Sequence, residues 1–231
     1  MKLPDLLHGK KIRYGGLIIA GILLGIGGMF VAQQIENMRK PAAFQPGGIT
    51  AAWVPQTVKR WHTLIETQAE RYNLDPNLVA IIMTMESGGG SWADSGQAEG
   101  LMQISPATAK DIAAKFLKEP KAKYDIWDPA TNIEFGAAYL AYLRDEFTMG
   151  NSPIETVYTV ELMAAGYNGG PGAANNVYLG KGLTDTQTVV YARDAFNMWR
   201  ERAAAKSPTY SRWLERGGQK LVDAAKNENT P

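Results

Sequence analysis

The sequence predicts an all-α domain with irregular loops, preceded by one transmembrane helix. Three observations support this fold class. Residues 15–32 form an uncharged, mostly apolar stretch of 18 residues. From about Trp53 onward, apolar residues recur at the spacing of an amphipathic helix, and no convincing alternating run typical of a strand occurs. Five expected helix starts share a capping residue followed by proline.

The apolar stretch at 15–32 reads GGLIIAGILLGIGGMFVA. As a helix it would span roughly 27 Å at about 1.5 Å per residue, which is close to the thickness of a bilayer core. Lys10, Lys11 and Arg13 precede it, so residues 1–14 are expected to be a basic cytoplasmic N-terminus and the remainder to cross the membrane. A buried core helix is the alternative, but such a helix usually has a polar stripe and this one has none.

A cleaved signal peptide is the second alternative for this stretch. The apolar run is longer than the usual 7–15 residues of a signal peptide, and cleavage after Ala32 would place bulky Phe30 at the −3 position. We therefore expect a retained anchor at 15–32. Prolines and glycines interrupt residues 33–56, which predicts a linker between the membrane and the folded domain.

The starts of the predicted helices are marked by Asp or Ser followed by proline. The capping side chain accepts a free backbone N–H, and proline occupies a position where no N–H is needed. The pairs are Asp75-Pro76, Ser105-Pro106, Asp128-Pro129, Ser152-Pro153 and Ser207-Pro208. Helices are predicted at 56–72, 76–87, 106–117, 129–147, 153–166, 185–204 and 208–225. Glycine-rich stretches at 88–90 and 169–172 are expected to end the helices before them.

Composition excludes several classes of function. The chain has 24 Lys and Arg against 23 Asp and Glu, a formal charge of +1, so it lacks the basic character of a nucleic-acid-binding protein. It has no cysteine, which excludes disulfides, thiolate metal sites and a cysteine nucleophile. Its two histidines, His8 and His62, make a multi-histidine metal centre unexpected. We therefore expect no metal, no cofactor and no nucleic-acid partner.

Glu86 is the strongest candidate for chemistry. It lies in the last turn of the helix predicted from Pro76, on the flank of an apolar face that includes Ile82 and Met85. Partial burial and the negative end of the helix dipole should both raise the pKa of its carboxyl group. A carboxyl that stays protonated near neutral pH suits a general acid. The simpler interpretation is a solvent-facing glutamate that precedes a glycine cap.

The surroundings of Glu86 favour the functional interpretation. Five motifs follow one another along the chain: Glu86-Ser87, Gly-Leu-Met-Gln at 100–103, Asp-Pro with Asn-Ile within 128–133, Gly-Tyr-Asn at 166–168, and Tyr191. In this order and at these spacings the sequence resembles the lytic transglycosylases of the soluble-transglycosylase (SLT) type, which share a fold with goose-type lysozyme. The resemblance covers about residues 57–200. It implies a lysozyme-like catalytic domain at 57–204. The tail at 205–231 extends beyond the resemblance, and its apolar residues Trp213, Leu214, Leu221 and Val222 predict a C-terminal helical extension.

The resemblance also implies a reaction, the cleavage of the β-1,4 bond between N-acetylmuramic acid and N-acetylglucosamine in peptidoglycan. Glu86 would first protonate the glycosidic oxygen and then take a proton from the C6 hydroxyl, giving a 1,6-anhydro product without water. A hydrolytic muramidase of lysozyme type is the alternative, and it would normally need a second carboxylate. Asp94 and Glu99, in the loop after Glu86, are the nearest candidates in sequence, although ordinary loop charges are the simpler interpretation.

The first two motifs supply three candidate substrate-binding residues. Ser87 would donate a hydrogen bond to the acid or to the substrate. Met102 offers an adaptable apolar wall for a sugar face, although a place in the core is the alternative. Gln103 can both donate and accept, which suits an N-acetyl amide.

The last two motifs supply three more candidates. Tyr167 and Asn168 resemble the pair that lies near the reacting sugar in this family, and a capped helix end is the alternative. Tyr191 matches a tyrosine near the catalytic acid in this family, and a place in the hydrophobic core is the alternative.

The sequence also departs from the family: the loop after Glu86 is glycine-rich and carries Trp92, and Gln187 replaces the usual glutamate before Tyr191.

Together with the apolar stretch at 15–32, the resemblance implies a place in the cell: the bacterial inner membrane with a single span, and the catalytic domain in the periplasm. The expected partners are peptidoglycan strands and the membrane, with a role in an envelope-spanning secretion or conjugation complex as a further possibility. A peptidoglycan-binding or scaffolding module is the alternative from a different functional class. An intact Glu86 argues against it, because a binding module would not require an acid.

Overall fold

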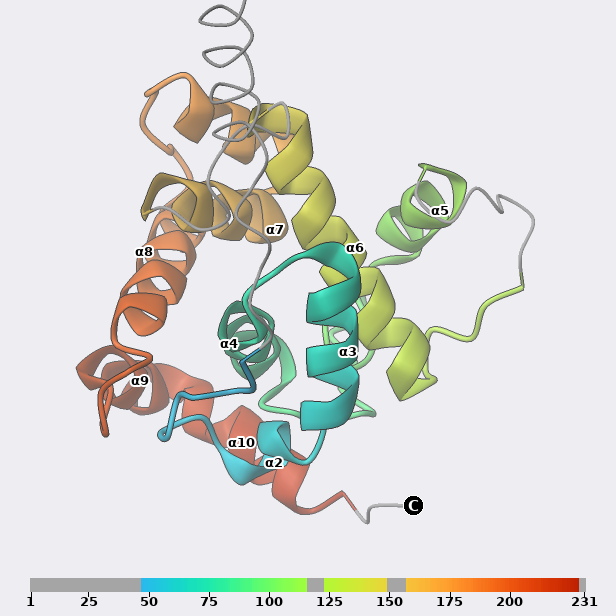
Figure 1. Ribbon diagram of the computed structural model, residues 1–231, viewed down its shortest axis with the longest axis vertical. Helices are drawn as coiled ribbons and strands as arrows, with labels where there is room; N and C mark the ends of the chain where they lie inside the picture. Colours follow the sequence, from blue (N-terminus) through green and yellow to red (C-terminus); the bar gives the residue numbers. More distant parts are fainter. Residues whose placement is uncertain (1–46, 116–122, 149–156, 229–231) are drawn as a thin grey trace, which may run out of the picture. The chain divides into compact units, whose positions relative to one another are not determined.

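The computed structural model describes residues 47–115, 123–148 and 157–228, which form helices joined by irregular loops (Figure 1). The elements are α2 (Gln56–Lys59), α3 (His62–Tyr72), α4 (Pro76–Ser87), α5 (Pro106–Lys115), α6 (Pro129–Thr148), α7 (Val157–Tyr178), α8 (Thr186–Arg200), α9 (Pro208–Trp213), the π-helix η1 (Leu214–Gly218) and α10 (Gln219–Lys226). Within these ranges the extended structure consists of isolated bridges at Glu99 with Asp94 and Ile104. The predicted all-α class is confirmed for this part of the chain.

The predicted anchor at 15–32, the N-terminus at 1–14 and most of the linker at 33–56 lie outside the described residues. Among the residues that are described, none of the helices has the length and apolar character needed to cross a bilayer.

Helix α4 lies at the centre of the fold and packs against α2, α3, α8 and α10 (Figure 1). It begins as predicted: Asp75 caps it by accepting the backbone N–H of Asn77 at 2.8 Å, and Pro76 is its first residue. Its sequence predicts one apolar face, but every residue of α4 except Glu86 is buried. Each buried leucine, isoleucine or methionine side chain contributes about 1.5–3 kcal/mol to the free energy of unfolding, so the core holds this helix firmly.

The turn that ends α4 requires glycine because two other helices approach it closely. Gly88 has φ 62° and Gly89 φ 88°. A Cβ atom on Gly88 would lie 2.6 Å from the backbone of Leu221 in α10, and one on Gly89 would overlap the carbonyl of Thr57 in α2. The predicted glycine stop at 88–90 therefore serves tight packing as well as helix termination.

Two predicted helices are divided in the structure, and a third extends beyond its predicted end. The helix expected at 56–72 is α2 and α3, separated at Arg60 and Trp61. The helix expected at 153–166 continues to Tyr178 in α7, but Gly170 has the non-helical angles φ 78° and ψ 176°. This break is the predicted one, since the proline at 171 cannot continue the hydrogen-bonded ladder. The helix expected at 208–225 is α9, η1 and α10 in succession.

Candidate active site

Glu86 lies at a cleft of about 530 Å³ formed by α4, the loop that follows it, and α5 to α8. The lining residues are Glu86, Ser95, Gln97, Ala98, Gln103, Ile104, Ser105, Thr108, Tyr139, Tyr167, Asn168, Gly170 and Gln187. Since its neighbours along α4 all point into the core, Glu86 is the residue through which this helix meets the cleft. Tyr191 of α8 donates a hydrogen bond from its Oη to Glu86 Oε1 at 2.5 Å.

The environment of Glu86 raises its pKa to about 7. The larger cause is burial, which disfavours the charged carboxylate, while the hydrogen bond from Tyr191 partly opposes it. The raised pKa agrees with the direction of the shift that the sequence predicts for Glu86. A carboxyl group with a pKa near 7 is protonated in a substantial fraction of molecules at neutral pH, and can therefore both give and take a proton.

Two tyrosines beside Glu86 act as donors. Burial and the nearby Glu86 raise the pKa of both Tyr167 and Tyr191 well above the usual value, so both hydroxyls stay protonated. Tyr167 donates to the backbone carbonyl of Met102 at 2.8 Å, and its ring packs against Tyr139, with centroids 5.5 Å apart. The wall of the cleft on the α6 and α7 side is thus built from aromatic rings with fixed hydroxyls.

The loop between α4 and α5 is held from behind by buried polar groups. The Ser87 hydroxyl donates to the Leu101 carbonyl at 2.7 Å. Asn132, which is buried in α6, accepts the Met102 backbone N–H at 2.7 Å and donates to the carbonyl of Glu99 at 2.9 Å. The Asn132 side chain therefore fixes this loop against α6.

The predicted site residues other than Tyr191, which bonds to Glu86, fall into two groups. Gln103, Tyr167 and Asn168 line the cleft with Glu86. Gln103 donates from Nε2 to the Ala93 carbonyl at 2.9 Å, and Asn168 accepts the Thr188 hydroxyl at 3.1 Å through Oδ1. The opposite end of each amide, Gln103 Oε1 and Asn168 Nδ2, has no hydrogen-bond partner among the described residues and is available to a ligand.

Ser87 and Met102 form the second group, behind the wall of the cleft. Ser87 is 2% exposed, and its hydroxyl bonds to backbone atoms. Met102 has no exposed surface, so it borders the site through its carbonyl, which accepts from Tyr167.

Sequence reasoning missed Tyr139, Ser105 and Thr108, which also line the cleft. Tyr139 lies in a run of α6 that has the composition of a core helix, so its periodicity gave no signal.

Smaller hollows adjoin the cleft. One of about 230 Å³ shares Thr108, Tyr139 and Gly170, and another of about 480 Å³ shares Gln187 and includes Trp213.

The structure separates Glu86 from the two carboxylates considered as its partners. Neither Asp94 nor Glu99 lines the cleft. Asp94 accepts the Gly96 backbone N–H at 2.7 Å within its own turn. Of the described residues, Glu86 is the only acidic one that lines the cleft. Asp111 lines the adjoining 230 Å³ hollow, where it lies 3.8 Å from Lys115.

Comparison with known proteins places the chain within a described family. Residues 63–189 match the transglycosylase SLT domain model. The chain is 32% identical over 168 residues to a protein of Actinobacillus pleuropneumoniae named membrane-bound lytic murein transglycosylase C, covering 67% of this chain and 45% of that protein. It is 30% identical over 198 residues to a protein of the same name from Haemophilus influenzae, covering 80% of this chain and 53% of the other.

The chain thus spans about half the length of these curated relatives. A search of solved structures found an inactive mutant of the lytic transglycosylase Slt from Pseudomonas aeruginosa. It has a TM-score of 0.48 and 26% sequence identity, and the match covers 64% of this chain and 25% of that one.

Proposed function

Since the chain belongs to the transglycosylase SLT domain family, we propose that it is a peptidoglycan lytic transglycosylase with Glu86 as its catalytic acid and base. Its substrate is the β-1,4 bond between N-acetylmuramic acid and N-acetylglucosamine. The names of the relatives, lytic murein transglycosylases, support this choice of polymer.

One observation carries the proposal. A carboxyl group with a pKa of about 7 stands in the cleft with a hydrogen bond from Tyr191, and no other described carboxylate lines that cleft. Most glycosidases use two carboxylates, one on each side of the bond that breaks. A single carboxyl group with a pKa near the working pH instead suits a reaction in which the same group is first the acid and then the base.

The first step breaks the glycosidic bond. Protonated Glu86 gives its proton to the oxygen that links the two sugars, and the bond between that oxygen and the anomeric carbon of muramic acid breaks. The departing N-acetylglucosamine takes both bonding electrons and the proton. The N-acetyl oxygen of the muramic acid stabilises the positive charge at the anomeric carbon, in place of a second carboxylate. Glu86 is left ionised.

The second step closes a ring. Ionised Glu86 takes the proton of the C6 hydroxyl of the same muramic acid, and the C6 oxygen bonds to the anomeric carbon. The product is a 1,6-anhydro sugar, no water is consumed, and Glu86 is protonated again for the next cycle. Tyr191 supports the first step, because its hydrogen bond stabilises the ionised carboxylate that this step leaves behind.

Three further residues would bind the sugars. Gln103 and Asn168 would bind N-acetyl or hydroxyl groups through Oε1 and Nδ2, and Tyr167 would present its ring edge to the reacting sugar. Ser87 and Met102 would act from behind, by fixing the loop that carries Gln103. A hydrolytic muramidase is the second candidate function, but the absence of another carboxylate among the described residues lining the cleft favours the transglycosylase.

We also propose an arrangement for the whole chain. Residues 1–14 would be cytoplasmic, 15–32 a retained single-pass anchor in the inner membrane, 33–56 a linker, 57–204 the periplasmic catalytic domain and 205–231 its helical extension. The word "membrane-bound" in the names of the relatives supports attachment to a membrane. A role in an envelope-spanning secretion or conjugation complex stays a prediction.

The test is mass spectrometry of the fragments that the full-length protein releases from purified peptidoglycan, with Glu86→Gln as the matched variant. We expect fragments that end in 1,6-anhydro-muramic acid from the wild type and none from the variant. Fragments with a reducing end, heavier by one water, would instead identify a hydrolase. Full activity in Glu86→Gln would contradict the assignment of the acid.

A further inference from the structure

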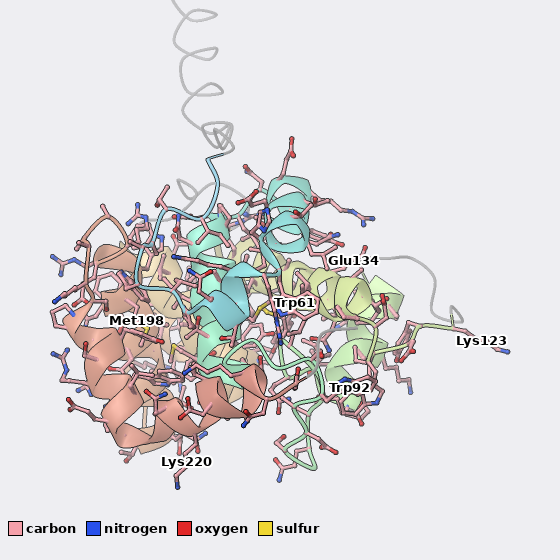
Figure 2. All side chains as sticks on the ribbon, turned by 90° about the horizontal axis from the view of Figure 1, so that it is seen from below. Trp61, Trp92, Lys123, Glu134, Met198 and Lys220 are labelled. Atoms are coloured by element: carbon pink, nitrogen blue, oxygen red, sulfur yellow. The ribbon has the colours of Figure 1, made fainter. Side chains whose placement is uncertain are left out.

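An exposed tryptophan, Trp92, stacks on a half-buried one, Trp127, at the surface of the fold. Trp92 lies in the loop after α4 (Figure 2), and its ring stacks on that of Trp127, with centroids 5.7 Å apart and planes inclined by 25°. Trp92 is 66% exposed, more than any other large hydrophobic side chain in the described part of the chain. The stacked pair therefore presents an exposed aromatic face at the surface, a kind of group used in binding sites.

Hydrogen bonds from other parts of the fold hold the backbone on both sides of the tryptophan pair. The carboxylate of Glu228, which follows α10, accepts the backbone N–H of Trp92 at 3.1 Å and that of Ser91 at 2.7 Å. Asn132 donates to the carbonyls of Glu99 and Ile126, both at 2.9 Å, and so joins the loop of Trp92 to the segment of Trp127. These contacts fix the backbone that carries the two indoles, which lowers the entropic cost of binding.

The same loop forms part of the catalytic cleft. Ser95, Gln97 and Ala98, only three to six positions after Trp92, line the cleft beside Glu86. One fixed loop thus presents an aromatic surface and a wall of the cleft. A polymer is a suitable ligand for this arrangement, since a strand that fills the cleft continues beyond it.

We propose that Trp92 and Trp127 form a carbohydrate-binding platform outside the catalytic cleft, which takes the face of a pyranose ring in a glycan strand. The electron-rich face of an indole attracts the C–H groups that line one side of a pyranose. The indole N–H of Trp92 has no partner among the described residues and can donate to a sugar hydroxyl. That the strand is peptidoglycan rests on the proposed function; that the platform binds a sugar face does not.

Binding is measured in the full-length Glu86→Gln protein, which removes turnover from the assay. The probes are insoluble peptidoglycan sacculi, by co-sedimentation, and chitohexaose, by calorimetry. Trp92→Ala is compared with Trp92→Phe, which keeps an aromatic face, and with Tyr178→Ala, which removes a 44% exposed aromatic residue elsewhere. We expect Trp92→Ala to weaken sacculus binding about three- to tenfold, the loss of one stacking contact. Trp92→Phe and Tyr178→Ala should stay within about twofold.

Two results would overturn the platform. Sacculus binding that is unchanged in Trp92→Ala would leave the indole pair as a contact for another protein. An equal loss in Trp92→Phe and Trp92→Ala would mean that the ring packs within the loop and does not stack on a sugar. Cleavage by the otherwise wild-type chain is scored separately, so a platform that binds sacculi without release of anhydro fragments would contradict the proposed function alone.

Discussion

The hydroxyl of Tyr191 lies 2.5 Å from Glu86 Oε1 and donates a hydrogen bond to it. The two residues come from α8 and α4, more than a hundred positions apart in the sequence. Burial raises the pKa of Glu86 and this hydrogen bond lowers it. Tyr191 therefore limits the rise in the pKa of the acid that burial causes.

The first prediction follows from this opposition. Tyr191→Phe removes the contact that lowers the pKa of Glu86, so that pKa should rise above about 7. A general acid works while it is protonated, and the alkaline limb of the pH profile of kcat/KM should accordingly move to higher pH. The maximum rate should fall on the order of tenfold, because the carboxyl group also loses its positioning contact. Tyr178→Phe is the control. An alkaline limb that stays in place or moves to lower pH would contradict the argument.

Glu86 should also lower the stability of the fold at neutral and alkaline pH. Its carboxyl pKa is raised from 4.5 to about 7 on folding, so the unfolded chain loses this proton at a lower pH than the folded one. The resulting loss of stability begins as pH rises through about 4.5 and is complete above about 7. Glu86→Gln should therefore raise the free energy of unfolding at pH 8 by on the order of 1–3 kcal/mol, with little effect at pH 4. Urea denaturation at both pH values tests this, and a gain of equal size at pH 4 would contradict it.

The C-terminal extension should stabilise the loop after the catalytic helix through Glu228. Its carboxylate accepts from the backbone of Ser91 and Trp92 and from the Ser91 hydroxyl at 3.0 Å, and it pairs with Arg60 at 3.4 Å. Glu228→Ala should lower the free energy of unfolding by about 1–2 kcal/mol, since hydrogen bonds to a charged group are among the stronger ones. Hydrogen exchange at the amides of Ser91 and Trp92 should quicken more than exchange elsewhere.

Glu215→Ala is the matched control for this prediction, because Glu215 lies in the same extension and is exposed. It should change the free energy of unfolding by less than about 0.5 kcal/mol. Equal losses in the two variants would mean that general charge effects, and not the contacts of Glu228, stabilise the loop.

The sequence predicts local structure and the acid better than it predicts how the site is assembled. The caps at Asp75 and Ser207 were readable because each depends on neighbouring residues, and both are confirmed. The raised pKa of Glu86 was predictable because burial follows from its apolar neighbours. The hydrogen bond from Tyr191 was not, since it depends on how α8 packs on α4.

Other features of the site escape sequence reasoning for the same physical reason. Tyr139 has the pattern of a core residue yet lines the cleft beside Gly170, and which face of α6 borders the cleft depends on how the helices pack. The C-terminal extension gave no functional signal, since Glu228 acts on a loop 137 positions earlier in the chain. Met102 is an apolar residue whose periodicity suits a core or a sugar wall equally, and its full burial was visible only in the structure.

The last prediction concerns the glycine turn that ends the catalytic helix. Gly89 has φ 88°, and a Cβ atom there would lie 2.8 Å from the backbone nitrogen of Val58 and still closer to the carbonyl of Thr57. Gly96 has φ 75° but nothing within 4 Å of the same position. Gly96→Ala should therefore lower the free energy of unfolding only by the cost of backbone strain, about 1–2 kcal/mol. Gly89→Ala should lower the free energy of unfolding by at least about 3 kcal/mol, since α2 or the turn must also shift to relieve the overlap. Urea denaturation of the two variants separates these contributions, and equal losses would show that packing against α2 does not constrain the turn.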